Sequence, residues 1–349
     1  MKEIPFRKSH PKGLYTLFAT EMWERFSYYG MRALLTLYLT AELVNGGFGL
    51  DRESALEVYA IFTGLVYLTP ILGGWISDKY FGQRKTVYIG GLVMAVGQFF
   101  LAASALLYET TQTTSDSRQF LFNFGLGVLI IGNGFFKPNI STVVGDFYNN
   151  NDPMKDSAFN IFYLGINLGA ILGTFIAGGL GEDIEWGYGF LAAGIGMILG
   201  VLWLKMREKT LDHYGLPPNS PEDKTILGRK DWVTIFIWMI GLIVTTYILM
   251  FSWSLIPEIA KTIITYGIFG AIILGLAYSI GKGTNGADEW SRMAVIIVLA
   301  VFNIVFWAGF EQAGGTFSLF AKNNTDRVMF GWEMPATWFQ NVNSFAILL

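Results

Sequence analysis

The sequence predicts an all-α protein that crosses a membrane many times. Of its 349 residues, 52% are hydrophobic and only 15% are charged, whereas a soluble domain carries about 25% charged residues. Its mean hydropathy is +0.43, and it contains 41 Gly, 29 Phe, 16 Tyr and 11 Trp. Apolar helices rich in Gly, with Trp and Tyr at the interfaces, are typical of membrane proteins. This composition excludes a soluble enzyme and a disordered scaffold.

Apolar segments recur along the chain at the length that a spanning helix needs. The hydrocarbon core of a bilayer is about 30 Å thick, so about 20 residues cross it as a helix. Nine segments meet this length, and a tenth starts near Ala336 and runs to Leu349. The nine are 14–40, 56–77, 86–108, 119–139, 157–180, 187–205, 232–254, 262–281 and 293–320.

The positions of Lys and Arg predict which way the chain is oriented. With the amino terminus inside, basic residues gather in the first segment, in the loop 79–85 and after residue 205, while the outer loops between the first six spans hold only Arg52 and Arg118. Cytoplasmic loops carry an excess of Lys and Arg. We therefore expect a cytoplasmic amino terminus. The polar segment 206–231, rich in Pro and charge, is the best candidate for a boundary between domains.

Several classes of site are excluded by what the sequence lacks. There is no Cys, which excludes disulfides and thiolate metal sites, and two His leave little room for an imidazole site. We expect no metal and no cofactor. A net charge of −3 gives no electrostatic footprint for nucleic acid. The sequence contains no phosphate-binding loop and no catalytic triad within the spans, so we expect no enzyme.

The first span carries charges at bilayer depth, where they are costly and usually functional. At about 100° per residue, four polar side chains fall on one face: Glu21, Arg25, Tyr28 and Arg32. Glu24 and Tyr29 flank this face. One interpretation is an ion-pair lattice that holds the helix in place. The other is a proton and substrate site, in which a carboxylate is ionised when paired with Arg and protonated when the pair opens.

Two further charges lie in apolar spans. Lys137 precedes Pro138, and two interpretations remain open: its ammonium reaches the interface, or a helix break at Pro138 directs it into a cavity. Glu311 lies in the middle of the span 293–320 with no cation within helical reach. It therefore needs a partner on another helix or a proton.

Polar and small residues on the fifth span suggest both packing and binding. Gly165, Gly169 and Gly173 repeat every fourth residue, a spacing that permits close helix contact. Asn167, on one face with Asn160 and Tyr163, is either a hydrogen-bonding link between helices or a ligand contact. In the loop 73–85, Asp78 and Arg84 are either a helix-end charge cluster or a network that stabilises a gate.

These residues resemble the motifs of a known family. Residues 21–30, EMWERFSYYG, look like the ExxERFxYYG motif of the proton-dependent oligopeptide transporters, a branch of the major facilitator superfamily. Residues 159–171, FNIFYLGINLGAI, resemble the second signature of that family. Residues 74–85 resemble the general major-facilitator loop motif, with one residue inserted and Gln83 before Arg84. By this resemblance the chain is identified as a bacterial-type member.

The resemblance implies a major facilitator fold and its division along the chain. Residues 1–208 would form a six-helix bundle, 209–231 a cytoplasmic linker, 232–284 two extra transmembrane helices, and 285–349 the start of a second bundle. We expect that second bundle to be truncated, because the acid that the family carries on its tenth helix has no counterpart in this sequence. The family often has Pro after Asn343, where this chain has Ser344.

The resemblance also implies an activity and the residues that carry it. A monomer in the cell inner membrane would import di- and tripeptides, with protons as the coupling ion, by alternating access. Arg32 would pair with Glu311 to close the outer gate, and Asp78 and Arg84 would belong to the gate network. Proton coupling would involve Glu21, Glu24, Arg25 and Glu311; the peptide would contact Arg32, Tyr28, Tyr29, Tyr67, Lys137, Asn167 and Asn343.

Two alternatives remain open. A transporter of the same fold could carry a non-peptide substrate such as nitrate, but such relatives lack part of the acid set around Glu21 and Glu24. A membrane receptor for peptides that does not transport them is the other alternative, and the chain has no signalling domain to support it.

Overall fold

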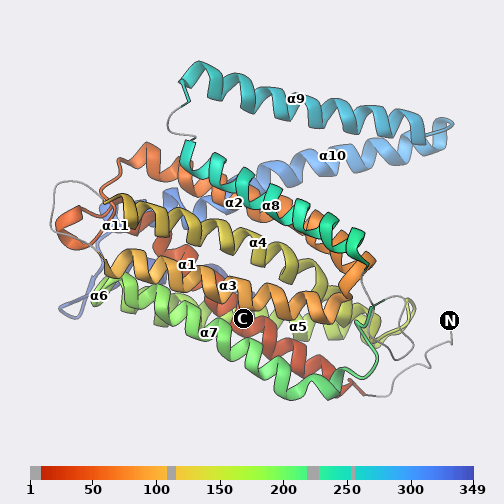
Figure 1. Cartoon of the computed structure of the whole chain (residues 1–349), viewed down its shortest axis with the longest axis horizontal. Helices are drawn as coiled ribbons and strands as arrows, with labels where there is room; N and C mark the ends of the chain where they lie inside the picture. Colours follow the sequence, from red (N-terminus) through yellow and green to blue (C-terminus); the bar gives the residue numbers. More distant parts are fainter. Residues whose placement is uncertain (1–8, 108–114, 218–227, 253–255) are drawn as a thin grey trace.

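The computed structural model describes residues 9–107, 115–217, 228–252 and 256–349, which form a mainly helical membrane protein (Figure 1). Its helices are α1 (Lys12–Thr40), α2 (Arg52–Ile76), α3 (Gln83–Leu106), α4 (Asp116–Asp146), α5 (Met154–Gly173), α6 (Gly179–Asp183), α7 (Trp186–Arg207), α8 (Arg229–Ser252), α9 (Glu258–Gly283), α10 (Ala287–Phe310), α11 (Thr316–Asn324) and α12 (Asn341–Leu348). Shorter helical turns are η1 (Leu43–Asn45), η2 (Ser77–Phe81), η3 (Thr174–Gly178), η4 (Glu208–Leu211), η6 (Glu311–Gly314) and η7 (Ala336–Gln340). Two short antiparallel strands, β1 (Val328–Met329) and β2 (Trp332–Glu333), complete it.

The helices of the first six spans pack against one another in pairs. Helix α1 contacts α5 and α7, α3 contacts α4 and α7, and α2 contacts α4. Among the described residues, seven helical segments are long and apolar enough to cross a membrane. Helix α1 is not one of them although it is long enough, because its interior charges lower its hydropathy. It is instead buried along most of its length.

The contact between α1 and α5 depends on glycine, as the spacing of Gly165, Gly169 and Gly173 predicts. A Cβ atom at Gly169 would lie 2.2 Å from the carbonyl oxygen of Met22, and one at Gly173 would lie 2.3 Å from that of Phe26. Small residues let two helix backbones approach closely in a membrane. The interpretation of the glycine repeat as packing is confirmed.

The two extra helices differ from the bundle in their exposure. Helix α8 lies against α4 and α2 (Figure 1). Helix α9 is exposed along nearly all its length, and its one buried residue is Lys261. The Lys261 ammonium lies 3.2 Å from a carboxylate oxygen of Glu57 on α2 and 2.7 Å from one of Glu258. Helix α9 is thus attached to the bundle by an ion pair at one end.

Two sequence predictions are wrong in detail. No break occurs at Pro138, because α4 continues through it to Asp146; proline is tolerated in membrane helices where neighbours satisfy the freed backbone groups. The span predicted over 293–320 is not one helix. Helix α10 ends at Phe310, and Glu311 begins the turn η6 rather than lying in mid-helix. Gly314 and Gly315, three and four residues after Glu311, are poor helix formers. They explain the break in the helix.

The glycine contact between α1 and α5 can be tested by filling it. We expect Gly169→Leu to lower the thermal unfolding temperature of the detergent-solubilised protein, because overpacking costs about 1–3 kcal/mol. Gly267→Leu on α9 is the matched control, since no atom lies within 4 Å of a Cβ at that position. Equal unfolding temperatures for the two variants would contradict the close packing of α1 on α5.

Candidate functional site

A cavity of ≈ 450 Å³ lies between the six-helix bundle and the elements that follow α9. Its volume is within the range of about 300–1,000 Å³ that small-molecule sites occupy. Its walls combine aromatic rings with a few charged groups. The lining residues are Glu21, Arg25, Tyr29, Arg32, Tyr67, Lys137, Ser141, Phe162, Tyr163, Ile166, Asn167, Ala170, Thr174, Trp307, Phe310, Ala313, Gln340, Asn341, Asn343, Ser344 and Ile347.

One wall of the cavity is a buried cluster of charges on α1. The Arg25 Nε atom lies 2.7 Å from Glu21 Oε1 and 2.8 Å from Glu24 Oε2. The helix itself brings Glu21 and Arg25 together, since they are four residues apart. Asn133 on α4 donates a hydrogen bond of 3.4 Å to Glu24 Oε1. Glu21 and Arg25 face the cavity, whereas Glu24 lies behind them, fully buried.

A second ion pair joins α1 to the turn after α10. Arg32 Nη2 lies 2.8 Å from Glu311 Oε2, and the Tyr67 hydroxyl donates to Glu311 Oε1 at 2.8 Å. The structure thus brings together Arg32 and Glu311, which are 279 residues apart in the chain. The break that ends α10 at Phe310 turns this carboxylate toward α1.

Tyr59 is a member of this network that the sequence analysis missed. Its hydroxyl accepts a hydrogen bond of 2.9 Å from Arg32 Nε and donates one of 2.9 Å to the carbonyl oxygen of Glu311. A signal for it exists in the sequence, because Tyr59 and Tyr67 are eight residues apart in one apolar helix and so share a face. Thr36 adds a hydrogen bond of 2.7 Å to the carbonyl oxygen of Gly314.

Lys137 differs from the other cavity cations in its surroundings. Its ammonium lies 4.4 Å from the centre of the Tyr67 ring, a cation–π arrangement. Within the described part of the chain, no carboxylate lies within 4.0 Å of it. Lys137 thus lines the cavity with an ammonium that has no ion-pair partner there.

The remaining predicted contacts divide into those that line the cavity and one that does not. Tyr29, Asn167 and Asn343 line it. Asn167 donates its side-chain amide to the carbonyl oxygen of Tyr163 in its own helix, so this amide hydrogen bond does not link two helices. Tyr28 is buried behind the wall, where its ring stacks on that of Phe62.

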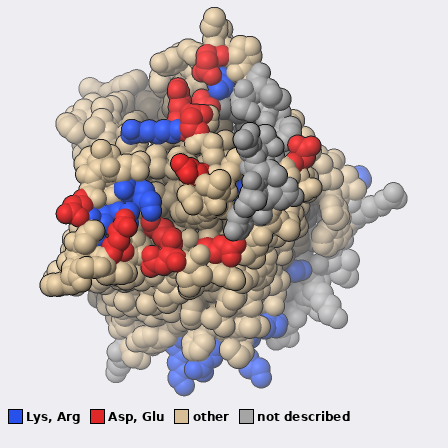
Figure 2. Space-filling model, turned by 90° about the vertical axis from the view of Figure 1, so that its left-hand side faces the viewer, with Lys and Arg blue, Asp and Glu red and all other residues tan. Residues whose placement is uncertain are grey.

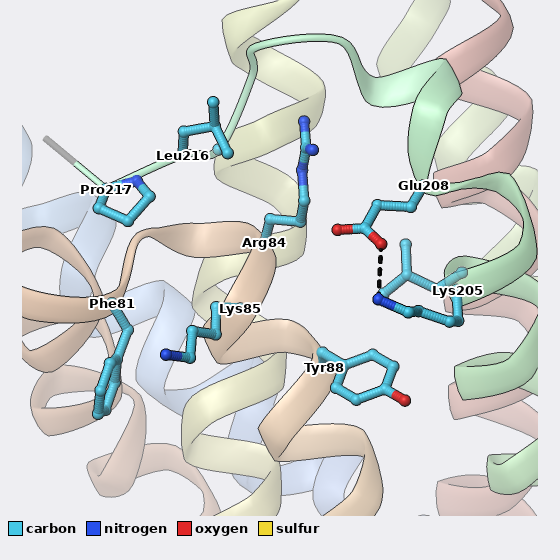
Figure 3. Close-up of a pocket in the computed structure, with 10 residues that line it drawn as sticks. Phe81, Arg84, Lys85, Tyr88, Lys205, Glu208, Leu216 and Pro217 are labelled. Atoms are coloured by element: carbon cyan, nitrogen blue, oxygen red, sulfur yellow. Dashed lines mark hydrogen bonds and ion pairs between the residues drawn. The ribbon is translucent and has the colours of Figure 1, made fainter. Parts of the chain in front are cut away.

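The structure does not bring Asp78 and Arg84 together. Asp78 accepts a hydrogen bond of 2.9 Å from Gln83. Arg84 donates to the carbonyl oxygens of Asp212 and Tyr214, so it holds the segment after η4 against the start of α3. Figure 3 shows Arg84 at a small pocket that Glu208 and Leu216 also line. This pocket shares no lining residue with the ≈ 450 Å³ cavity.

Comparisons with known proteins agree with this geometry. The profile of the POT family matches residues 84–349. An uncharacterised transporter of Bacillus subtilis, YclF, is 37% identical over the whole of this chain and 68% of its own length. The peptide transporter YePEPT of Yersinia enterocolitica is 34% identical over 97% of this chain and 66% of its own length. The chain thus spans about two thirds of the length of these relatives.

Solved structures show the same fold. A crystal structure of the peptide transporter POT in complex with sulfate has a TM-score of 0.78 and 34% identity, and it covers 99% of this chain and 68% of its own. A POT family transporter solved in complex with 5-aminolevulinic acid has a TM-score of 0.77 and 31% identity, and it covers 97% and 68%.

The charge cluster on α1 can be tested through stability. We expect Arg25→Met to destabilise the detergent-solubilised protein by about 3–5 kcal/mol, because it leaves buried carboxylates without a counter-charge. Removing one carboxylate as well, in Glu24→Gln/Arg25→Met, should recover part of the loss. Arg207→Met at the exposed end of α7 is the control. A denaturation midpoint in Arg25→Met equal to that of Arg207→Met would show that the cluster does not stabilise the fold.

Proposed function

Because the chain belongs to the POT family, we propose that it is a proton-coupled symporter that imports di- and tripeptides by alternating access. The observation that carries this proposal is the Lys137 ammonium, which lines the cavity without a carboxylate partner among the described residues. An unpaired cation in a mostly apolar site is available to a ligand carboxylate. The relatives in Yersinia enterocolitica and Lactococcus lactis are named as a peptide transporter and as di-/tripeptide transporters.

The proposed substrate matches the chemistry of the cavity. A peptide has a carboxylate, which Lys137 and Arg32 can bind, the first as a point charge and the second as a planar fork. Aromatic walls such as Tyr29 and Trp307 contribute apolar area with few fixed hydrogen bonds. We therefore expect recognition of the peptide backbone with broad tolerance for side chains. This activity transfers a solute and requires no covalent step.

The proposed coupling uses the pair between Arg32 and Glu311. When Glu311 takes up a proton, its attraction to Arg32 weakens, and Arg32 becomes free for the carboxylate of the peptide. Glu21, whose Oε2 atom has no hydrogen-bond partner in the described part of the chain, and Glu24 are the proposed proton relay beside Arg25. Release of the proton inside would complete the cycle.

We propose that the protein lies in the inner membrane of a bacterial cell with its amino terminus in the cytoplasm. We also propose that one chain suffices for transport. The end of the molecule that carries α6 and α11 would then face outside. Asp and Glu gather on that end, together with a few Lys and Arg (Figure 2). A shortage of basic residues in outer loops is consistent with this orientation.

The role of Lys137 can be measured in proteoliposomes containing the protein expressed from its complete gene. We expect Lys137→Gln to raise the KM for a dipeptide about ten- to a hundredfold, since a hydrogen bond to a charged group contributes about 1.5–3 kcal/mol. The KM for the same dipeptide with an amidated carboxyl terminus should not change. Lys155→Gln, at a half-buried lysine that does not line the cavity, is the control. An equal effect on both substrates would exclude Lys137 as the carboxylate partner.

The role of Glu311 separates coupling from binding. We expect Glu311→Gln to abolish the acceleration of dipeptide uptake by an inward pH gradient while counterflow of labelled against unlabelled dipeptide persists. One charge crossing 100 mV corresponds to about 2.3 kcal/mol, so accumulation should fall up to about fiftyfold. Glu53→Gln, on the surface, should behave as the wild type. Full gradient-driven dipeptide uptake by Glu311→Gln would contradict the role of Glu311 in coupling. Uptake of nitrate instead of dipeptide by the wild type would contradict the proposed substrate.

A further inference from the structure

A second buried carboxylate joins the bundle to the last part of the chain. Glu182, near the end of α6, has a side chain that is only 2% exposed. Its Oε1 atom accepts a hydrogen bond of 2.7 Å from the backbone N–H of Thr337, and its Oε2 atom accepts one of 3.1 Å from that of Ala336. The ammonium of Lys322 on α11 lies 3.5 Å from Oε2.

These hydrogen bonds satisfy a helix start that has no cap of its own. The helical segment η7–α12 begins after Pro335, and no side chain of its own caps it. The first N–H groups of a helix have no partner within it, and the positive end of the helix dipole favours an anion. Here the anion comes from α6, in the half of the structure that runs from α1 to α7, whereas η7 belongs to the other half, after α9. Glu182 therefore caps η7 only while the two halves are in contact.

The surface around Glu182 is shaped for close approach. Thr174, Gly178 and Glu182 are spaced four residues apart along one helical span, so they share a face. A Cβ atom at Gly178 would lie 2.5 Å from the hydroxyl oxygen of Thr337, and the hydroxyl of Thr174 contacts the side-chain oxygen of Asn341. Glu182 is the charged member of this contact, and it accepts hydrogen bonds from two backbone N–H groups in addition to its ion pair with Lys322.

We propose that Glu182 is a second gate contact, which holds the outer side of the transporter closed by capping η7 from α6. It acts in parallel with Arg32 and Glu311 but through different elements, α6 and η7 instead of α1 and η6. Opening of the outer side then requires Glu182 to release Ala336 and Thr337. This inference rests on the proposed alternating access and on the proposed orientation, and it adds a positioning residue to the gate.

The test measures the opening of the outer side directly. Val44→Cys and Asn324→Cys introduce two labelling sites, one on η1 and one at the end of α11, both exposed. Residues 1–349 contain no other Cys, and any Cys encoded elsewhere in the complete gene is replaced by Ser. Spin labels there report the distance between the two halves in lipid nanodiscs, with the protein expressed from its complete gene. We expect Glu182→Ala to raise the ratio of long to short distances at least about tenfold, because it removes two charge-assisted hydrogen bonds and the loss of one alone corresponds to about that factor.

Four further variants make the result specific. Glu182→Gln keeps one acceptor oxygen, so its ratio should lie between those of the wild type and Glu182→Ala. Gly178→Ala should shift the ratio in the same direction, because the added methyl group meets Thr337. Glu185→Gln and Glu185→Ala are the matched controls: Glu185 lies three residues along from Glu182, outside the contact, and neither should change the ratio.

An unchanged distance distribution in Glu182→Ala, or the same change in Glu185→Ala as in Glu182→Ala, would overturn the proposal. If Glu182→Ala does not fold, as judged by gel filtration, Glu182→Gln and Gly178→Ala decide it by the same criterion. Dipeptide uptake is measured in parallel and keeps the two hypotheses apart. If the wild type takes up no dipeptide, the proposed function is contradicted. The distance measurement needs no substrate, so it tests the Glu182 contact separately.

Discussion

Every charge buried on α1 needs a counter-charge, and this requirement organises the whole structure. An isolated ion in a low-dielectric interior is unfavourable by several kcal/mol. Helix α1 meets the requirement in two ways. Arg25 finds Glu21 and Glu24 on the same helix, whereas Arg32 finds its carboxylate on Glu311, in a remote part of the chain.

These two solutions have different mechanical properties. The pairs around Arg25 lie within one helix, so they do not require the elements after α9. The glycine contacts at Gly169 and Gly173 bind α1 to α5 backbone to backbone, which makes the bundle a stiff unit. The contacts made by Arg32 and Glu182 connect that unit to the elements after α9. A relative motion of the two parts would therefore break these contacts and leave the interior of the bundle intact.

The sequence predicts well what depends on local pattern. The positions of most spans, the charged face of α1 and the glycine face of α5 all follow from patterns along one helix. What it does not predict depends on partners far away in the chain. Tyr59 is uncharged, so the search for buried charges does not identify it. The role of Glu182 depends on its contact with Ala336 and Thr337, which only the structure shows. The absence of a break at Pro138 likewise depends on neighbouring helices, whereas the break after Phe310 has a local signal in Gly314 and Gly315 that the sequence analysis did not use.

The network around η6 contains two hydrogen bonds that protonation of the Glu311 carboxylate does not remove. The hydroxyls of Tyr59 and Thr36 donate to the carbonyl oxygens of Glu311 and Gly314, and a backbone carbonyl keeps its acceptor at every pH. The interruption of the helix leaves these carbonyls free to accept, because an intact helix would use them internally. A proton on Glu311 would then weaken the contact without abolishing it. In an alternating-access cycle, protonation of Glu311 would then shift the equilibrium between the closed and open outer gate only in part. Binding of a ligand in the cavity would supply the remaining shift.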